Sequence, residues 1–167
     1  PPHCTIPVAD GAACDIANYV PGTNASIFSP QGGVRIGMLD LARIGQVLFD
    51  LQRGDESTFL SPEMAHRAMW SIATNDTGAE PWFCHYGLHI QAIEMPGRAC
   101  DDVLFADGIP RLGHAGEAYG LRSGLWIDPK GDTGVAYFVT AVPEPEVEDT
   151  GGFVAEEIEL VRRAMNM

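Results

Sequence analysis

Basic side chains are scarce in this sequence. Its 167 residues include ten Lys and Arg against 23 Asp and Glu, which gives a formal net charge of −13 at pH 7. Binding to nucleic acid needs a concentrated basic surface, and ten cations scattered along the chain do not make one. An anionic membrane surface is disfavoured for the same reason. The composition therefore argues against both as partners.

Long apolar runs are also lacking. No stretch approaches the ~20 apolar residues of a membrane-spanning helix, so we expect no membrane span. No basic and then apolar secretory pattern opens the chain. The sequence starts at Pro1-Pro2 without an initiator Met, and we expect a processed, cleaved or truncated polypeptide. Hydrophobic residues make up 46% of it, so residues 1–167 should form a single domain or part of one.

Cysteines are few, and sequence alone does not pair them. Cys4, Cys14, Cys84 and Cys100 allow three connectivities. Proximity favours Cys4 with Cys14 and Cys84 with Cys100. Two such disulfides would indicate an oxidising compartment, so that the protein is periplasmic or secreted. The alternative is four buried free thiols in a cytoplasmic protein.

No metal site or other cofactor is expected. Cys84, His85 and His89 lie close in the sequence and include zinc-ligand types. On an extended strand, however, His85 and His89 would stand about 13 Å apart at ~3.3 Å per residue, too far to share one ion.

The first half of the chain changes from irregular to helical. Residues 1–30 are rich in Pro, Gly, Asn and Ser and predict an irregular N-terminal arm. Residues 31–80 predict a helical region. Within it, apolar residues at helical spacing predict a helix over 38–51. Ser61 followed by Pro and Glu predicts a capped helix over 62–70.

The second half predicts an antiparallel sheet. Branched and aromatic residues in the region 81–143 predict strands at about 82–95, 118–128 and 134–142, the last two joined by a turn with the sequence DPKGD. Residues 153–167 predict an amphipathic C-terminal helix that packs on the sheet. The expected fold class is α+β, an antiparallel sheet covered by helices.

One titratable side chain stands between glycines just before the second of these strands. Residues 98–111 predict a polar, acidic connection, and Gly113-His114-Ala115-Gly116 follows it. Glycines let the backbone approach a ligand closely, which makes His114 a candidate site residue. The alternative is a loop histidine that is hydrogen-bonded to backbone.

These residues resemble a known motif. Gly-His-Ala-Gly, followed by an aromatic-Gly pair, a Ser and an Asp-Pro turn, is similar to the third motif of the beta-lactamase-like serine hydrolases. That family includes class C beta-lactamases, penicillin-binding proteins, D-aminopeptidases and related esterases. Upstream, SPQGGVR at 29–35 and LDLAR at 39–43 resemble the family's Gly-Gly turn and the helix after it. The resemblance covers about residues 19–167 and implies the C-terminal part of a beta-lactamase/transpeptidase-like fold.

The resemblance also implies site residues. His114, Ala115 and Gly116 match the family's Lys/His-Thr/Ser-Gly triplet, on the strand that forms one wall of the active-site cleft. His114 and Ala115 would contact substrate, and His114 could bind its carboxylate when protonated. The backbone N–H of Glu117 would complete the oxyanion hole. Because Ala115 lacks the usual hydroxyl, an ester or peptide substrate is favoured over a beta-lactam.

Two of the family's motifs are missing. Its nucleophile is a Ser one helical turn before a Lys, and the single lysine here, Lys130, lies in a turn. The sequence also has no Tyr-x-Asn, and Ser123 is displaced by one residue from a Gly-x-Ser-x-Gly elbow. The resemblance thus implies the C-terminal portion of a serine hydrolase, a fragment that forms its acyl-enzyme only with the N-terminal portion of the same protein or another copy. The alternative is a non-catalytic binding module of the same fold.

Overall fold

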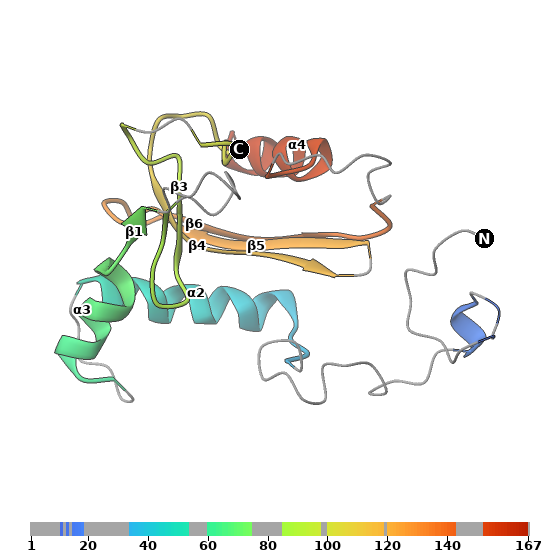
Figure 1. Cartoon of the computed structure of the whole chain (residues 1–167), viewed down its shortest axis with the longest axis horizontal. Coiled ribbons are helices and arrows are strands. Elements are labelled where there is room, and N and C mark those ends of the chain that lie inside the picture. The colour runs from blue at the N-terminus through green and yellow to red at the C-terminus, as the bar shows by residue number, and fades with distance from the viewer. Residues whose placement is uncertain are drawn as a thin grey trace.

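The computed structural model describes residues 34–53, 60–74, 85–97, 100–118, 120–142 and 152–166, together with 11, 13 and 15–18. Over these residues the chain is α+β: an antiparallel sheet lies between helices (Figure 1). This confirms the predicted fold class at that level. Apart from the short 3-10 helix η1 (Ile16–Asn18) and its neighbours, the predicted N-terminal arm lies outside the described residues. None of the described helices is long and apolar enough to cross a membrane.

The sheet is a meander, because each strand pairs antiparallel with the next one along the chain. Its six described strands are β1 (Ala73–Thr74), β2 (His85–Tyr86), β3 (Gln91–Ile93), β4 (Arg111–Ala118), β5 (Leu121–Ile127) and β6 (Gly134–Val139). The predicted strands 118–128 and 134–142 correspond to β5 and β6. β1 falls inside the region predicted to be helical and was not anticipated.

The predicted continuous strand over 82–95 is wrong. A tight turn separates β2 from β3, where the Gly87 N–H donates to the Ile90 carbonyl over 2.8 Å. His89 has φ 63°, a left-handed conformation that no extended strand contains. The chain folds back at this point, so the 13 Å separation expected between His85 and His89 on a straight strand does not apply.

Two further predictions about this region need correction. Residues 113–116 belong to β4 itself rather than preceding the strand. The connection 98–111 is also not simply solvated, since Leu104 and Phe105 are buried. One carboxylate holds it in place: Glu94 Oε1 accepts the N–H groups of Leu104 over 3.0 Å and Phe105 over 2.5 Å, and Oε2 accepts that of Ala106 over 3.0 Å. Such charge-assisted bonds are stronger than neutral ones, so an acidic side chain fixes an apolar loop.

The helices follow the prediction closely. α2 (Met38–Arg53) and α3 (Pro62–Trp70) match the predicted helices, and α4 (Ala155–Met165) matches the C-terminal one. The Ser61 hydroxyl accepts the Met64 N–H over 3.3 Å, which satisfies one of the orphan donors of α3. These helices form where local signals predict them.

Helices cover both faces of the sheet, with α2 and α4 on opposite sides (Figure 1). Side chains alternate along a strand, so neighbouring residues of β5 enter different cores. Ile127 packs with Leu51 of α2 and Met69 of α3. Trp126 packs with Val161 of α4 and meets the Phe153 ring edge-on at 5.8 Å between centroids. The two cores fix which face of the sheet each residue of β4 and β5 points to.

A buried carboxylate attaches α4 to β6. Glu157 is 1% exposed, accepts the Tyr137 hydroxyl over 2.8 Å and accepts the Val154 N–H over 3.1 Å. Removal from water disfavours the charged form and raises the pKa of Glu157 above its usual value. The folded state therefore holds this proton at a pH where the unfolded chain has released it.

Replacing Glu157 by Gln should flatten the pH dependence of stability. A raised carboxyl pKa means that the free energy of unfolding falls as pH rises from about 4.3, the unfolded value, to the folded pKa. Gln keeps both hydrogen bonds, because its carbonyl can accept from Val154 while its amide donates to the Tyr137 hydroxyl oxygen. Urea unfolding of both proteins from pH 4 upward measures the effect. The exposed Glu156→Gln is the control, and an equal flattening in that variant would contradict the assignment.

Candidate functional site

One edge of β4 is uncovered next to the predicted site residues. The ladder between β3 and β4 ends at the pair Gln91 and Gly113, whereas the ladder with β5 continues to Ala118. The Ala115 N–H points away from β5 and donates to Gln91 Oε1 over 3.4 Å. Because N–H groups alternate sides along an antiparallel strand, the Glu117 N–H points to the same edge. Among the described strands, none covers that edge beyond Gly113.

His114 is exposed at this edge, and its ring contacts Ala115 and Tyr86. Its Nδ1 lies 2.5 Å from the Ala115 carbonyl oxygen, and its Nε2 lies 2.7 Å from the Tyr86 hydroxyl. The two rings are perpendicular, with centroids 5.5 Å apart. Since a carbonyl can only accept, Nδ1 carries the hydrogen in the neutral ring and Nε2 accepts from the Tyr86 O–H. The contacts select a tautomer and a ring orientation.

Tyr86 is a site residue that sequence reasoning did not identify. It lies 28 residues before His114, and no local pattern links the two positions. The sheet brings them together, because Tyr86 pairs with Gln91 and Gln91 pairs with Gly113. The sequence predicted only a strand over 82–95 for the segment that contains Tyr86, and gave this side chain no role.

A cleft of about 390 Å³ lies between α2 and the start of this edge. Its lining combines apolar side chains of α2 with the sheet residues of the predicted motif: Leu41, Ile44, Leu48, His114, Ala115, Gly116 and Ser123. His89 also lines the cleft, at the turn between β2 and β3. The structure thus brings the sequence-predicted triplet and the only serine of β5 to one largely apolar cleft.

Ser123 faces Gly116 across the ladder. Its hydroxyl donates to the Gly116 carbonyl over 3.5 Å, a bond to backbone rather than to an imidazole. A Cβ at position 116 would come within 2.4 Å of the Ser123 Oγ, so the glycine makes room for this hydroxyl. The arrangement does not activate Ser123 as a nucleophile.

The acidic side chain of Glu117 is neutralised within the sheet. Its Oε2 lies 2.5 Å from Nη1 of Arg122, the residue opposite on β5. The Arg122 side chain is only 11% exposed, which reduces screening of this pair by solvent. The negative charge is thereby compensated, and the backbone N–H of Glu117 at the uncovered edge remains a suitable donor for a developing oxyanion.

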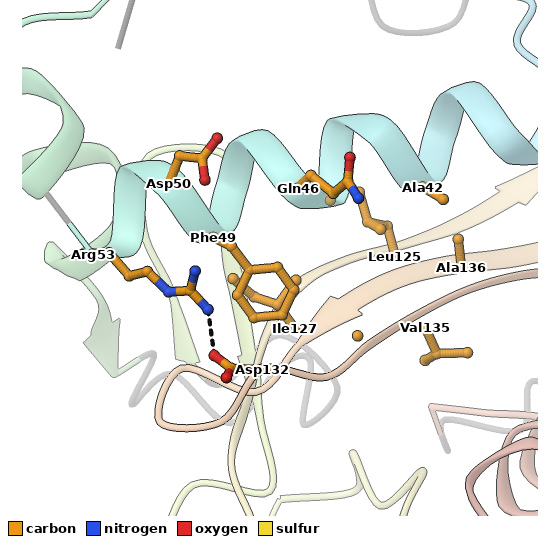
Figure 2. A pocket seen from close by; sticks show the side chains of 12 residues that line it. Ala42, Gln46, Phe49, Asp50, Arg53, Leu125, Ile127, Asp132, Val135 and Ala136 are labelled. Carbon is orange, nitrogen blue, oxygen red and sulfur yellow. Dashed lines mark hydrogen bonds and ion pairs between the residues drawn. The ribbon is translucent and has the colours of Figure 1, made fainter. Parts of the chain in front are cut away.

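A second, larger cleft of about 550 Å³ lies between α2 and strands β5 and β6. Figure 2 shows Arg53 paired with Asp132 at its polar end, and the guanidinium carbon lies 5.5 Å from the centroid of the Phe49 ring. The lining of this larger cleft contains none of the site residues predicted from the sequence. Because its strongest charges already neutralise each other, we take the smaller cleft as the candidate site.

The predicted disulfides are described only in part. Cys100 is disulfide-bonded, while Cys4, Cys14 and Cys84 lie outside the described residues. Near Cys100, the sulfur lies 3.7 Å from Nδ1 of His85. The pairing of the four cysteines stays a prediction.

No protein-family model matches this chain, and neither a curated protein nor a solved structure matches it.

Proposed function

We propose that this chain is the C-terminal portion of a beta-lactamase-like serine hydrolase that acts by acyl transfer on an ester, amide or peptide. The nucleophilic Ser and its Lys would lie outside the chain. The observation that carries the proposal is the pairing of His114 with Tyr86 at an apolar cleft beside the uncovered edge of β4. An oriented imidazole and a backbone donor at an open edge, the Glu117 N–H, are what recognition of an acyl substrate needs.

Each group has a role in this proposal. The Glu117 N–H donates to the oxyanion that forms when Ser attacks the carbonyl, a type of contact worth about 3–4 kcal/mol when one donor is lost. Protonated His114 donates from Nε2 to a substrate carboxylate, which takes the place of the Tyr86 hydroxyl, while its Nδ1–H keeps the bond to the Ala115 carbonyl. The Ala115 side chain packs against the core that contains Val161 of α4, so this residue can meet a substrate in the cleft only through its backbone.

The substrate and the missing partner would use different edges of the sheet. An extended peptide can add its main chain to the uncovered edge of β4, with a side chain in the apolar cleft. At the other end, β6 pairs only with β5 among the described strands. An open edge invites another strand, so the N-terminal portion of the same protein, or another copy, would pair there. The disulfide at Cys100 supports a periplasmic or secreted location, and a cytoplasmic one is the alternative.

The alternative function is a non-catalytic binding module. It is favoured by Ser123, whose hydroxyl is bonded to a backbone carbonyl instead of a base. In that case the edge of β4 and the cleft would bind an extended peptide without catalysing any reaction.

Labelling with a serine-directed fluorophosphonate distinguishes the two. We expect no covalent mass increase on the isolated chain, and labelling with ester turnover once the polypeptide encoded upstream of Pro1 is added. Labelling of the isolated chain that disappears in Ser123→Ala would show that the nucleophile is here and that the proposal is wrong. If the upstream polypeptide restores neither labelling nor turnover, the binding module is correct.

A further inference from the structure

Three buried side chains of different chemistry converge behind the turn between β2 and β3. His85 of β2 is 7% exposed, and Asp102 of the following loop is 2% exposed. With Cys100, they offer an imidazole nitrogen, a sulfur and a carboxylate oxygen that all lie within 4.8 Å of one another. Cys100 and Asp102 reach His85 because the strand breaks after Tyr86, a feature that the sequence did not predict.

Asp102 is incompletely satisfied in this arrangement. Its Oδ2 is buried and has no hydrogen-bond partner among the described residues. Burying a carboxylate oxygen without a partner is unfavourable. A cation between these groups would remove this cost.

The donor set fits zinc. Zinc takes nitrogen, sulfur and carboxylate ligands at about 2.0–2.3 Å in a tetrahedron, so donors that are 4.8 Å apart or closer need only a modest inward shift to share one ion. The ligating form of cysteine is the thiolate. In the disulfide-bonded state of Cys100 this ligand is absent, so reduction has to come first.

We propose that His85, Cys100 and Asp102 form a zinc site that is available only after the Cys100 disulfide is reduced. A dithiol reductant supplies two electrons and two protons, the S–S bond breaks into two thiols, and the dithiol closes to its own disulfide. Zn²⁺ then replaces the Cys100 thiol proton, which leaves to solvent. Three protein ligands leave one tetrahedral position for water. This site is separate from the His114 cleft. The redox state of Cys100 would determine whether the loop at residues 100–102 is held by a disulfide or by a metal ion.

Zinc titration of the complete chain in both redox states tests this site. Reduction uses a phosphine, which takes oxygen from water as the two thiols form and does not compete strongly for the metal. We expect one equivalent of Zn²⁺ to bind to the reduced chain, measured by competition with a chromophoric chelator, and none to the oxidised chain. Cobalt(II) should give thiolate charge-transfer absorption in the reduced chain only. Equal binding by both forms would overturn the proposal.

Variants identify the ligands. Cys100→Ser should abolish the cobalt charge-transfer band, and Asp102→Asn should weaken zinc binding by at least about tenfold, since even outer-shell partners contribute 10–100-fold. The adjacent Asp101→Asn is the matched control, because Asp101 is exposed. The double variant Cys4→Ser/Cys14→Ser should bind as the parent does. Loss of binding in this double variant, or its retention in Cys100→Ser, would place the metal elsewhere, and circular dichroism confirms that each variant is folded.

Discussion

Replacing Gly113 by Ala is expected to lower the free energy of unfolding by about 3 kcal/mol or more, at the upper end of overpacking effects. A Cβ at this position would lie 1.8 Å from the Leu125 carbonyl oxygen and 3.0 Å from Trp126 Cα. Both are backbone atoms of β5, so no side-chain rotation relieves the contact. Gly113 is also paired on both sides, with Gln91 and with Trp126, and β4 therefore cannot shift without breaking a ladder. Urea unfolding followed by circular dichroism measures the loss.

Gly116→Ala is the matched control for this substitution. Its Cβ would also come too close to β5, but to the Ser123 Oγ at 2.4 Å, an atom that can rotate away. We expect a loss of roughly 1 kcal/mol, at the low end of the overpacking range. Comparable losses in the two variants would mean that the proximity of the β5 backbone does not determine the requirement for glycine at position 113.

Replacing His114 by Ala in the intact protein, with its upstream portion, is expected to lower kcat/KM for hydrolysis of an ester substrate that carries a carboxylate by roughly 10- to 100-fold, because a hydrogen bond to a charged group contributes about 1.5–3 kcal/mol. The side chain is exposed, so the melting temperature should change little. Tyr86→Phe should give a smaller loss, because it removes the hydroxyl that contacts Nε2 at 2.7 Å but retains the ring. Initial rates and thermal unfolding are measured on the same samples.

A structural role for His114 predicts a different result. Stability would then fall in His114→Ala while activity per folded molecule stays unchanged. His66→Ala is a suitable control, since His66 is an exposed histidine on α3 and lies outside the candidate cleft. A loss of activity in both histidine variants would argue for a general effect on the protein rather than for a role at the site.

The sequence predicted the elements whose signals are local. α2 was expected from apolar residues at helical spacing, and α3 was expected from the Ser61 cap followed by Pro and Glu. The break between β2 and β3 was not expected, because the left-handed conformation of His89 is uncommon for any residue other than glycine and has no compositional signature. A sequence that alternates like a strand was therefore assigned as one strand.

Only part of the candidate site could be predicted from the sequence, for a related reason. His114 was marked by its flanking glycines, but Tyr86 joins it only through two strand pairings. The burial of Phe105 was missed because the segment around it is acidic. Composition cannot show that one distant carboxylate, Glu94, accepts the backbone donors of that segment. This part of the fold is determined by contacts between residues that are far apart in the sequence.

The long ladder between β4 and β5 also limits how the length of this chain can change during evolution. Seven consecutive pairs run from Leu112 with Ile127 to Ala118 with Leu121. A single inserted or deleted residue in either strand would exchange the two faces, moving Trp126 into the place of Ile127 and emptying both cores at once. A length change of one residue inside these strands would therefore require a β-bulge that restores the register, whereas the turns outside the strands are free of this constraint. In related chains, an odd gap within residues 112–118 or 121–127 would predict such a bulge.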